Sequence, residues 1–455
     1  MKDFTQGSIR GHLLAMAVPT FVGMLVQLLY LLVDLYFVSR LGNDAVAGVS
    51  AAGNASLIVI ALTQVLNVGA VALVSQAAGA KDRERAEIAF NQSFVLAWIF
   101  AALVLAGGAL GVHAYMNSLS ATPAIADAGT TYLFWYLPGL ALQFPMTAAA
   151  AGLRATGVVK TVMAVQMLSV LTNIALAPVL VAGWGTGHPL GVAGAGLASS
   201  LSVAVGGVFV LAYFLRHETY VRPHLGRLRP HLATIAKLLR IGVPAGGEYG
   251  LLFLVTMVSF ALIRHFGADA QAGFGIGSRL LQSLLMPAMA IGVAVPAVVG
   301  QNFGGGRADR VRQTLVEALV LESGLMVAMV VLCHLAPAVP VRWYTSDPAT
   351  TQVAVDFLRI ISWNFFAVGV TFACSGVFQG VGRTTQSLIG TVVRVATFLA
   401  GALWLSHRPG FALIDVWHLS VIAAVLQAAT SAFLVRRLLR AGGGARPKPQ
   451  AEPAV

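Results

Sequence analysis

The most regular feature of the sequence is a series of long apolar runs separated by short polar segments. Each run is long enough to cross the hydrocarbon core of a membrane, which is about 30 Å thick and needs about 20 helical residues. The pattern predicts an all-α polytopic membrane protein. The twelve expected membrane-spanning helices cover residues 13–38, 47–74, 88–112, 127–150, 158–182, 192–214, 241–263, 270–299, 313–335, 352–375, 386–406 and 412–435.

Composition supports a membrane protein. Of the 455 residues, 58% are hydrophobic and only 10% are charged, whereas soluble domains carry about 25% charged residues. A secreted enzyme, a nucleic-acid binder and a soluble repeat protein are poor fits. Cys333 and Cys374 both lie inside apolar runs, so the sequence offers neither a disulfide framework nor a cysteine metal site.

The net charge is +12, and the positions of the Lys and Arg residues along the sequence indicate the membrane topology. Of the 29 Lys and Arg, 22 lie on one side of the expected helices and three lie within helices, while the other side has only Arg40, Arg264, Arg342 and Arg408. Because cytoplasmic loops are rich in Lys and Arg, both termini are expected in the cytoplasm. An even number of spans agrees with this. No removable signal peptide is expected.

An internal repeat relates the two halves of the chain at a constant offset of 225 residues. Aligned identities include Pro19 with Pro244, Gly42 with Gly267, Gln76 with Gln301, and Gly157 with Gly382. Six expected spans separate equivalent points, so the halves are parallel repeats. Two such lobes around a central cavity favour a carrier over a channel. We predict an N-terminal lobe at 1–215, a basic cytoplasmic linker with amphipathic character at 216–240, a C-terminal lobe at 241–437 and a disordered cytoplasmic tail at 438–455.

Several short motifs occur in order along the chain. They are Pro19 followed by Val33–Gly42, then Gln76–Gly79, Gly152–Gly157, Gly191–Ala195 and Gly376–Gly382. This ordered set, over about residues 10–435, resembles the multidrug and toxic compound extrusion (MATE) family. The resemblance implies twelve helices in two lobes, outward-facing and inward-facing states, and export of organic, often cationic, compounds against sodium or proton entry.

Asp34 is the main candidate for chemistry inside the expected spans. Gln27 and Tyr30 precede it by seven and four residues, which places all three on one helical face that is expected to line a cavity. An ionised carboxylate at the bilayer centre costs at least ~2.5 kcal/mol. Burial would therefore let Asp34 hold a proton and release it when water or a cation arrives. The resemblance assigns ion coupling to this acid, and an interfacial pair with Arg40 is the alternative.

The helix at 158–182 contributes neutral groups to the same expected site. The family commonly has an Asp four residues after the position of Asn173, but Ala177 stands there. The expected site therefore has few anionic ligands for sodium. This favours protons as the coupling ion, and sodium bound at Asp34 is the alternative. No cofactor is expected. The expected ion-coupling residues are Asp34, Asn173, Gln166 and Tyr30.

Glu248, in the helix at 241–263, is the second acidic candidate. Some sodium-coupled members of the family carry a glutamate about one turn later on this helix. A salt bridge with Arg279 or Arg394 is the alternative, and Glu322 is expected to bond to a neighbouring helix. Aromatic side chains could hold flat cations by cation–π contact, with helix packing as the alternative. The expected substrate-binding residues are Glu248, Gln27, Gln64, Asn67, Arg279, Tyr136, Phe274 and Trp363.

These observations predict that the protein is an ion-driven antiporter for small amphipathic, cationic compounds. It is expected to act as a monomer in the inner membrane of a bacterium. The segment Gly152–Gly157 lacks the Lys-Ser/Thr pair of a phosphate-binding loop, so no ATP site is expected, and no local sequence indicates an enzyme. The alternative is a lipid-linked oligosaccharide flippase of the same superfamily. Arg279 and Arg394 support it because a phosphate needs cations, whereas twelve spans and Asp34 argue against it.

Overall fold

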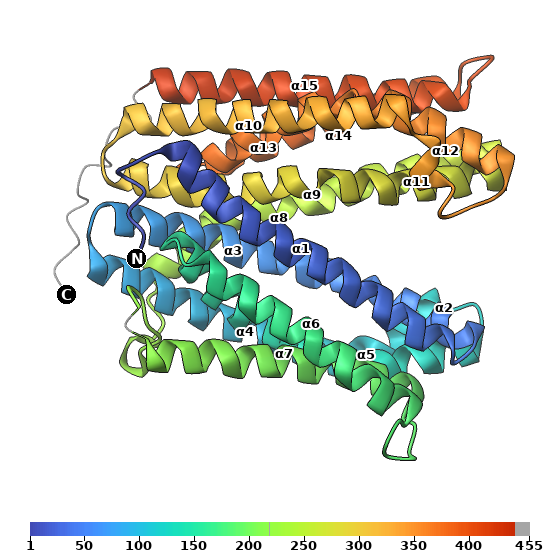
Figure 1. Cartoon of the computed structure of the whole chain (residues 1–455), viewed down its shortest axis with the longest axis horizontal. Coiled ribbons are helices and arrows are strands. Elements are labelled where there is room, and N and C mark those ends of the chain that lie inside the picture. The colour runs from blue at the N-terminus through green and yellow to red at the C-terminus, as the bar shows by residue number, and fades with distance from the viewer. Residues whose placement is uncertain (218, 442–455) are drawn as a thin grey trace. The chain divides into compact units, whose positions relative to one another are not determined.

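A computed structural model shows a chain that folds into α-helices (Figure 1). It describes residues 1–217 and 219–441, apart from the side chains of Leu31, Leu32, Asp34, Leu35 and Leu225. No β-strand occurs among the described residues. The α-helices are α1 (Ile9–Ser39), α2 (Asn43–Gly53), α3 (Ala55–Gly79), α4 (Arg83–Leu119), α5 (Pro123–Ala155), α6 (Val159–Ala182), α7 (Gly191–Arg216), α8 (Leu232–Ile263), α9 (Ala268–Gly304), α10 (Ala308–Leu335), α11 (Ala338–Val341), α12 (Pro348–Ile361), α13 (Asn364–Val381), α14 (Thr385–Ser406) and α15 (Leu413–Arg440), with the 3-10 turns η1 (Leu225–Arg227) and η2 (Arg264–Phe266).

Eleven candidate membrane spans occur among the described residues, judged by length and apolar composition. The twelfth expected span, at 127–150, lies within α5, which carries two internal prolines together with Tyr, Thr and Gln residues that reduce its hydropathy. Because α5 packs against α2, α3, α4 and α7, much of its surface is shielded from lipid. The prediction of an all-α polytopic fold is confirmed. The structure extends α15 through the first residues of the expected tail, and residues 442–455 of that tail lie outside the described residues.

The chain forms two compact units. Unit 1 contains Met1–Asp3 and Pro19–Gly242, and unit 2 contains Phe4–Val18 and the chain from Val243 onwards. Helix α1 therefore contributes to both units, and the boundary between the two units within this helix lies at Pro19. A proline inside a helix removes one backbone hydrogen bond and is a common position for bending.

The segment from Phe4 to Val18 is held within unit 2 by hydrogen bonds to its backbone and by an ion pair. The N–H of Phe4 donates to Gln301 Oε1 at 2.9 Å, and Arg310 donates to the carbonyl oxygen of Phe4 at 3.1 Å. Arg10 forms an ion pair with Glu317 at 2.9 Å. The sequence analysis placed the whole of residues 1–215 in one lobe, and hydropathy carries no signal for these contacts.

The 225-residue repeat is also visible in the backbone. Gly157 and Gly382 have φ angles of 80° and 78°, and Lys81 and Gly306 have φ angles of 59° and 72°. Positive φ is unfavourable for residues with a side chain. The left-handed conformation of Lys81 at the position equivalent to Gly306 therefore indicates that the two units share the same local turn.

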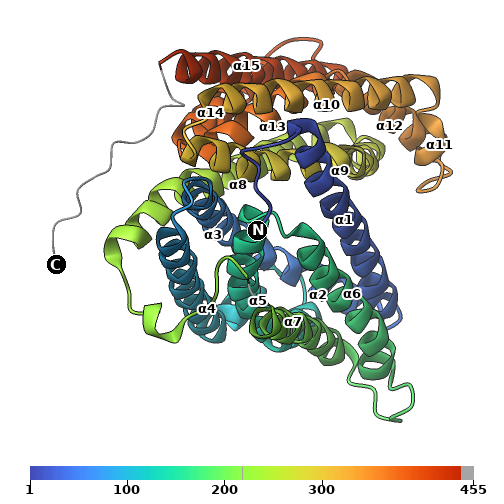
Figure 2. The ribbon, with the colours of Figure 1, turned by 60° about the vertical axis from the view of Figure 1, so that its left-hand side comes forward.

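Small residues let the helices within unit 1 approach closely, as the neighbouring ribbons of α5 and α7 show in Figure 2. A Cβ atom added at Gly139 would lie 2.7 Å from Cα of Ser200, and one added at Gly196 would lie 2.5 Å from the carbonyl oxygen of Tyr132. Ser200 Oγ also accepts a hydrogen bond from the Gly139 N–H at 3.0 Å. Close backbone approach of this kind is typical of packed membrane helices.

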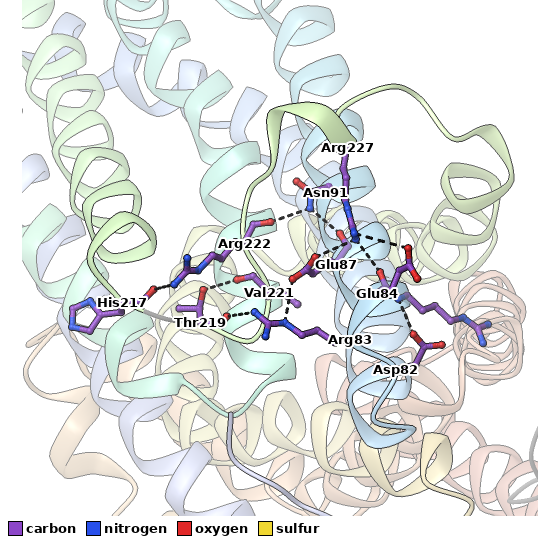
Figure 3. Close-up of polar contacts among 11 residues, drawn as sticks. Asp82, Arg83, Glu84, Glu87, Asn91, His217, Thr219, Val221, Arg222 and Arg227 are labelled. Carbon is purple, nitrogen blue, oxygen red and sulfur yellow. Dashed lines mark hydrogen bonds and ion pairs between the residues drawn. The ribbon is translucent and has the colours of Figure 1, made fainter.

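The segment between α7 and α8 is fastened to α4 by two buried amides, Asn91 and Gln92 (Figure 3 shows the Asn91 contacts). The structure starts α8 at Leu232, earlier than the expected end of the linker. We call the contacts made by Asn91 and Gln92 with this segment the linker clamp. Its linker partners are the carbonyls of Arg222, Arg227 and Arg229 and the N–H groups of His224 and His231, at 2.7 to 3.0 Å.

Ion pairs lie beside the linker clamp (Figure 3). Glu87 contacts Arg227 at 3.1 Å and Arg83 at 3.2 Å. Arg83 also donates to the carbonyl oxygen of Thr219 at 3.5 Å. The basic linker is thus held against the first turns of α4 by neutral amides and by a shared carboxylate.

Candidate functional site

Unit 1 contains a cavity of about 320 Å³. Its wall is built from α1, α3, α5, α6 and α7, and combines apolar side chains with neutral polar groups and one arginine. The described lining residues are Gln27, Tyr30, Thr63, Tyr136, Gln143, Met146, Thr147, Ala150, Leu153, Arg154, Val162, Val165, Gln166, Ser169, Val170, Ser199, Ser202, Val203 and Val210. This mixture suits a small amphipathic molecule, because apolar walls give affinity and a few polar groups give orientation.

Helix α1 presents Gln27 and Tyr30 to this cavity. The Tyr30 hydroxyl is hydrogen-bonded to the Ser199 hydroxyl of α7 at 2.8 Å. Gly23 brings α1 close to α6, since a Cβ atom there would lie 2.4 Å from Gln166 Oε1. The face of α1 that was expected to meet a cavity is therefore the face that lines one.

Asp34 belongs to α1 and follows Tyr30 by four residues. Its side chain lies outside the described part of the structure. The expected role of Asp34 in ion coupling therefore stays a prediction, as does the alternative pair with Arg40. The Arg40 guanidinium lies 4.6 Å from the ring centroid of Tyr36.

Arg154, near the end of α5, lines the cavity and was missed by the sequence analysis. Its guanidinium donates to Asn67 Oδ1 at 2.7 Å, and Asn67 donates to Gln64 Oε1 at 3.2 Å. Among the described lining residues Arg154 is the one with a formal charge, and no acid pairs with it among the described ion pairs. The sequence signal that could have found Arg154 is the spacing of Tyr136, Gln143, Thr147 and Arg154 by seven, four and seven residues, which puts these polar residues on one face of α5.

Helix α6 carries a stripe of polar residues, Gln166, Ser169 and Asn173. The first two line the cavity. Asn173 is fully buried, and neither its Nδ2 nor its Oδ1 has a hydrogen-bond partner within the described residues. A buried amide without partners is costly, so this position is suited to bind a polar group or an ion that the described residues do not supply.

Glu248 lies in unit 2, at a small polar cluster. Its carboxyl group is hydrogen-bonded to Ser387 of α14, whose hydroxyl lies 2.8 Å from that of Ser375. Gln379 donates to Ser375 at 3.1 Å. Oε1 of Glu248 has no partner among the described residues, which leaves one carboxylate oxygen available.

The alternative interpretation of Glu248, a salt bridge with Arg279 or Arg394, does not occur among the described ion pairs. Arg279 is exposed instead. Arg394 donates to Gln427 Oε1 at 3.3 Å, and Gln427 donates in turn to Thr391. The alternative failed because charge alone suggested both arginines, whereas Gln427 on the adjacent helix is the partner of Arg394, and the substrate-binding role of Glu248 stays a prediction.

The three expected aromatic residues have different surroundings. Tyr136 lines the unit 1 cavity and accepts a hydrogen bond from Gln143 at 3.1 Å. Phe274 is buried in an aromatic cluster and stacks on Trp417 with ring centroids 5.4 Å apart, so it serves packing. Trp363 is 55% exposed and contacts His334 edge-on. Only Tyr136 of these three is brought to the cavity.

Two helical units built on one repeat, with a polar cavity among membrane-spanning helices, define a membrane transporter. The MatE family model matches residues 19–179 and 244–402. The chain belongs to this family, as its motifs indicated.

Relatives and solved structures agree over nearly the whole chain. The probable multidrug resistance protein YpnP of Bacillus subtilis is 24% identical over 91% of this chain and 90% of its own length. The multidrug export protein MepA of Staphylococcus aureus is 24% identical over 94% and 96%. A solved MOP superfamily transporter from Pyrococcus furiosus has a TM-score of 0.90 at 23% identity, covering 97% of this chain and 98% of that one. The last comparison shows a shared fold.

Proposed function

We propose that the protein is a secondary active antiporter that exports small amphipathic, cationic compounds in exchange for protons. Membership of the MatE family and the names of its multidrug relatives support this proposal. The basic loops support a multi-pass protein in the inner membrane of a bacterium with both termini in the cytoplasm. We expect it to act as a monomer in the bilayer, by alternating access, without a nucleic-acid partner.

The observation that carries the proposal is the position of Tyr30. Its hydroxyl bonds to Ser199 inside the unit 1 cavity, and Asp34 follows one helical turn later on the same face of α1. A carboxyl group at that position would be ionised when a cation binds and protonated when the cation leaves. Drug and proton would then compete, and competition for one site is the basis of exchange.

Protons are favoured over sodium by the groups around Tyr30. The polar wall is made of amides, hydroxyls and the guanidinium of Arg154, none of which is anionic, and Ala177 occupies the position on α6 where an acid is common in the family. Sodium prefers several oxygen ligands with anionic character. One carboxyl group without further anionic neighbours among the described lining residues is a poor sodium site, so protons are favoured and sodium remains the alternative coupling ion.

Replacement of Asp34 by Asn tests the proposal. Cells that lack their own efflux pumps should lose the export of a fluorescent cationic dye when they carry Asp34→Asn. The matched control is Asp44→Asn, because Asp44 is an exposed acid in the first turn of α2. Equal abundance of both variants in the membrane excludes a folding defect. Dye export by Asp34→Asn at the wild-type rate would refute the role of Asp34.

A lipid-linked flippase is the second candidate, and Arg154 favours it. A guanidinium in the cavity wall that has no acidic partner among the described ion pairs would suit a phosphate or carboxylate head group. Purified wild-type protein in vesicles should be tested for translocation of a fluorescent anionic lipid and for dye export, alongside Arg154→Gln. Lipid translocation that requires Arg154, without dye export, would favour the flippase and reject the antiporter.

A further inference from the structure

Glu322 of α10 is a buried acid that the unit 1 cavity and the Glu248 cluster do not involve. Its side chain is 1% exposed. Neither Oε1 nor Oε2 has a hydrogen-bond partner among the described residues, and Glu322 is absent from the ion pairs of the described chain. The expected bond to a neighbouring helix is therefore wrong, because no polar group among the described residues lies within hydrogen-bond distance of either oxygen.

The carboxyl group lies where α10 crosses α13. A Cβ atom added at Gly369 would lie 3.3 Å from Cβ of Glu322, 3.4 Å from Cγ of Met326 and 3.8 Å from Oε2 of Glu322. Met326, one turn further along α10, is buried in an apolar cluster with Val330 and Phe365. The missing side chain of Gly369 makes the room that the acid occupies.

Glu322 has no cationic partner among the ion pairs that the structure describes. Helix α10 packs against α9, α12 and α13, and none of their ionisable groups is bonded to Glu322 among the described contacts. Between Leu280 and Gly304, where α9 is most apolar, it has no ionisable residue. The ionisable residues on these four helices are Asp269 and Arg279 on α9, Asp356 and Arg359 on α12, Cys374 on α13, and Asp309, Arg310, Arg312, Glu317, Cys333 and His334 on α10.

The repeat shows that packing alone does not require an acid here. The positions in unit 1 equivalent to Glu322 and Gly369 are Ala97 and Phe144, both fully buried. There the crossing of α4 and α5 is filled by the Phe144 ring, which contacts Phe100 edge-on at 5.8 Å. The same helix crossing is thus built without a polar atom in unit 1 and around a carboxyl group in unit 2.

We propose that Glu322 is a proton-binding site of unit 2, which holds a proton while α10 and α13 are packed at Gly369 and releases it to water when this crossing opens. An ionised carboxylate without a partner is strongly disfavoured in such surroundings. Opening breaks the O–H bond of the carboxyl group, transfers the proton to water and leaves a hydrated carboxylate. Reclosing requires the reverse transfer. The packing of unit 2 then depends on proton concentration.

This inference rests on the proposed proton antiport, and two measurements test it. The first is infrared absorption of the purified protein at about pH 7, where an exposed glutamate is ionised. The spectrum should contain the carbonyl band of a protonated carboxyl group that disappears in Glu322→Gln. The matched control is Glu317→Gln on the same helix, because Glu317 is paired with Arg10 and its replacement should leave the band intact.

The second measurement counts the protons released to a pH indicator when the detergent-solubilised protein binds a cationic dye. Glu322→Gln should release fewer protons than the wild type, by up to one per molecule, and Glu317→Gln should match the wild type. Glu322→Leu copies the apolar packing of unit 1 and should show the same reduced count as Glu322→Gln.

Two results would overturn the proposal. One is a wild-type spectrum without the band. The other is a band that Glu322→Gln removes while the proton count stays at the wild-type value, which would make Glu322 a static part of the packing. Failure of the antiporter proposal looks different: the wild type would then export no cationic dye under any gradient, whereas failure of this inference occurs in a protein that still exports dye.

Discussion

Replacement of Gln92 by Leu should open the linker clamp without disturbing the membrane-spanning helices. Gln92 is 2% exposed and bonds to three backbone groups of the linker, the carbonyls of Arg227 and Arg229 and the N–H of His231. Leu has a similar volume but offers no polar atom. The three backbone groups would then have to bond to water, which they can do only if the linker leaves α4.

The size of the effect follows from the number of bonds lost. Each internal hydrogen bond contributes about 1 kcal/mol net, so Gln92→Leu should make local opening easier by about 3 kcal/mol. Since 1.4 kcal/mol is tenfold in an equilibrium constant, the open population should rise about a hundredfold. Asn91→Leu removes two linker bonds and should raise it about thirtyfold.

Limited digestion with trypsin measures this opening, because the linker contains the cleavable bond between Arg227 and Leu228, whereas Arg222 and Arg229 are each followed by a proline that prevents cleavage. When opening is fast compared with cleavage, the cleavage rate follows the open population. Gln352→Leu is the matched control, since Gln352 is exposed on α12 and bonds only to Asp356 among the described contacts. Cleavage of Gln92→Leu at the wild-type rate, or slower than that of Asn91→Leu, would refute the reasoning.

Two further predictions concern the backbone and its caps. Gly306→Ala should destabilise unit 2 by about 1 kcal/mol because φ is positive at Gly306, while Lys81→Gly should have a smaller and stabilising effect. Thermal unfolding in detergent measures the stability of both variants. Equal destabilisation by the two substitutions would contradict the shared turn. The backbone N–H of Thr350 donates to Asp347 and lowers the pKa of that carboxyl group. The stability that this hydrogen bond gives to the start of α12 is therefore fully present above the ordinary pKa of about 4. It is lost as the pH falls through the lowered pKa of Asp347. Asp347→Asn keeps the cap without titrating, so its melting temperature relative to the wild type should rise on acidification, and a constant difference would count against this cap.

The membrane-spanning helices could be predicted because lipid imposes a simple requirement on their length and polarity. The repeat was equally accessible, because Gly157 and Gly382 are needed at equivalent turns. The membership of Phe4–Val18 in unit 2 could not be predicted. It depends on bonds from Gln301 and Arg310 to the backbone of Phe4, and backbone groups have the same chemistry at every position.

The candidate site was predictable where it depends on helical periodicity. The spacing of Gln27 and Tyr30 places both on one face of α1, and the structure places both on the cavity wall. Arg154 was missed although Gln143 and Thr147 precede it on one face of α5, because a basic residue near a helix end also serves as a topology signal. Ser199 was missed because a serine in a run of small residues is equally typical of close helix packing. The pairing of Glu248 with Arg279 or Arg394 failed because opposite charges on different helices meet only if the helices turn the right faces to each other.

The most direct test of the central claim is dye transport in proteoliposomes under separately imposed gradients. The wild type should move a cationic dye against an inward proton gradient and should not respond to a sodium gradient alone, and Asp34→Asn should respond to neither. Transport by Asp34→Asn at the wild-type rate, or a wild type that a proton gradient leaves inactive, would contradict proton exchange at Asp34.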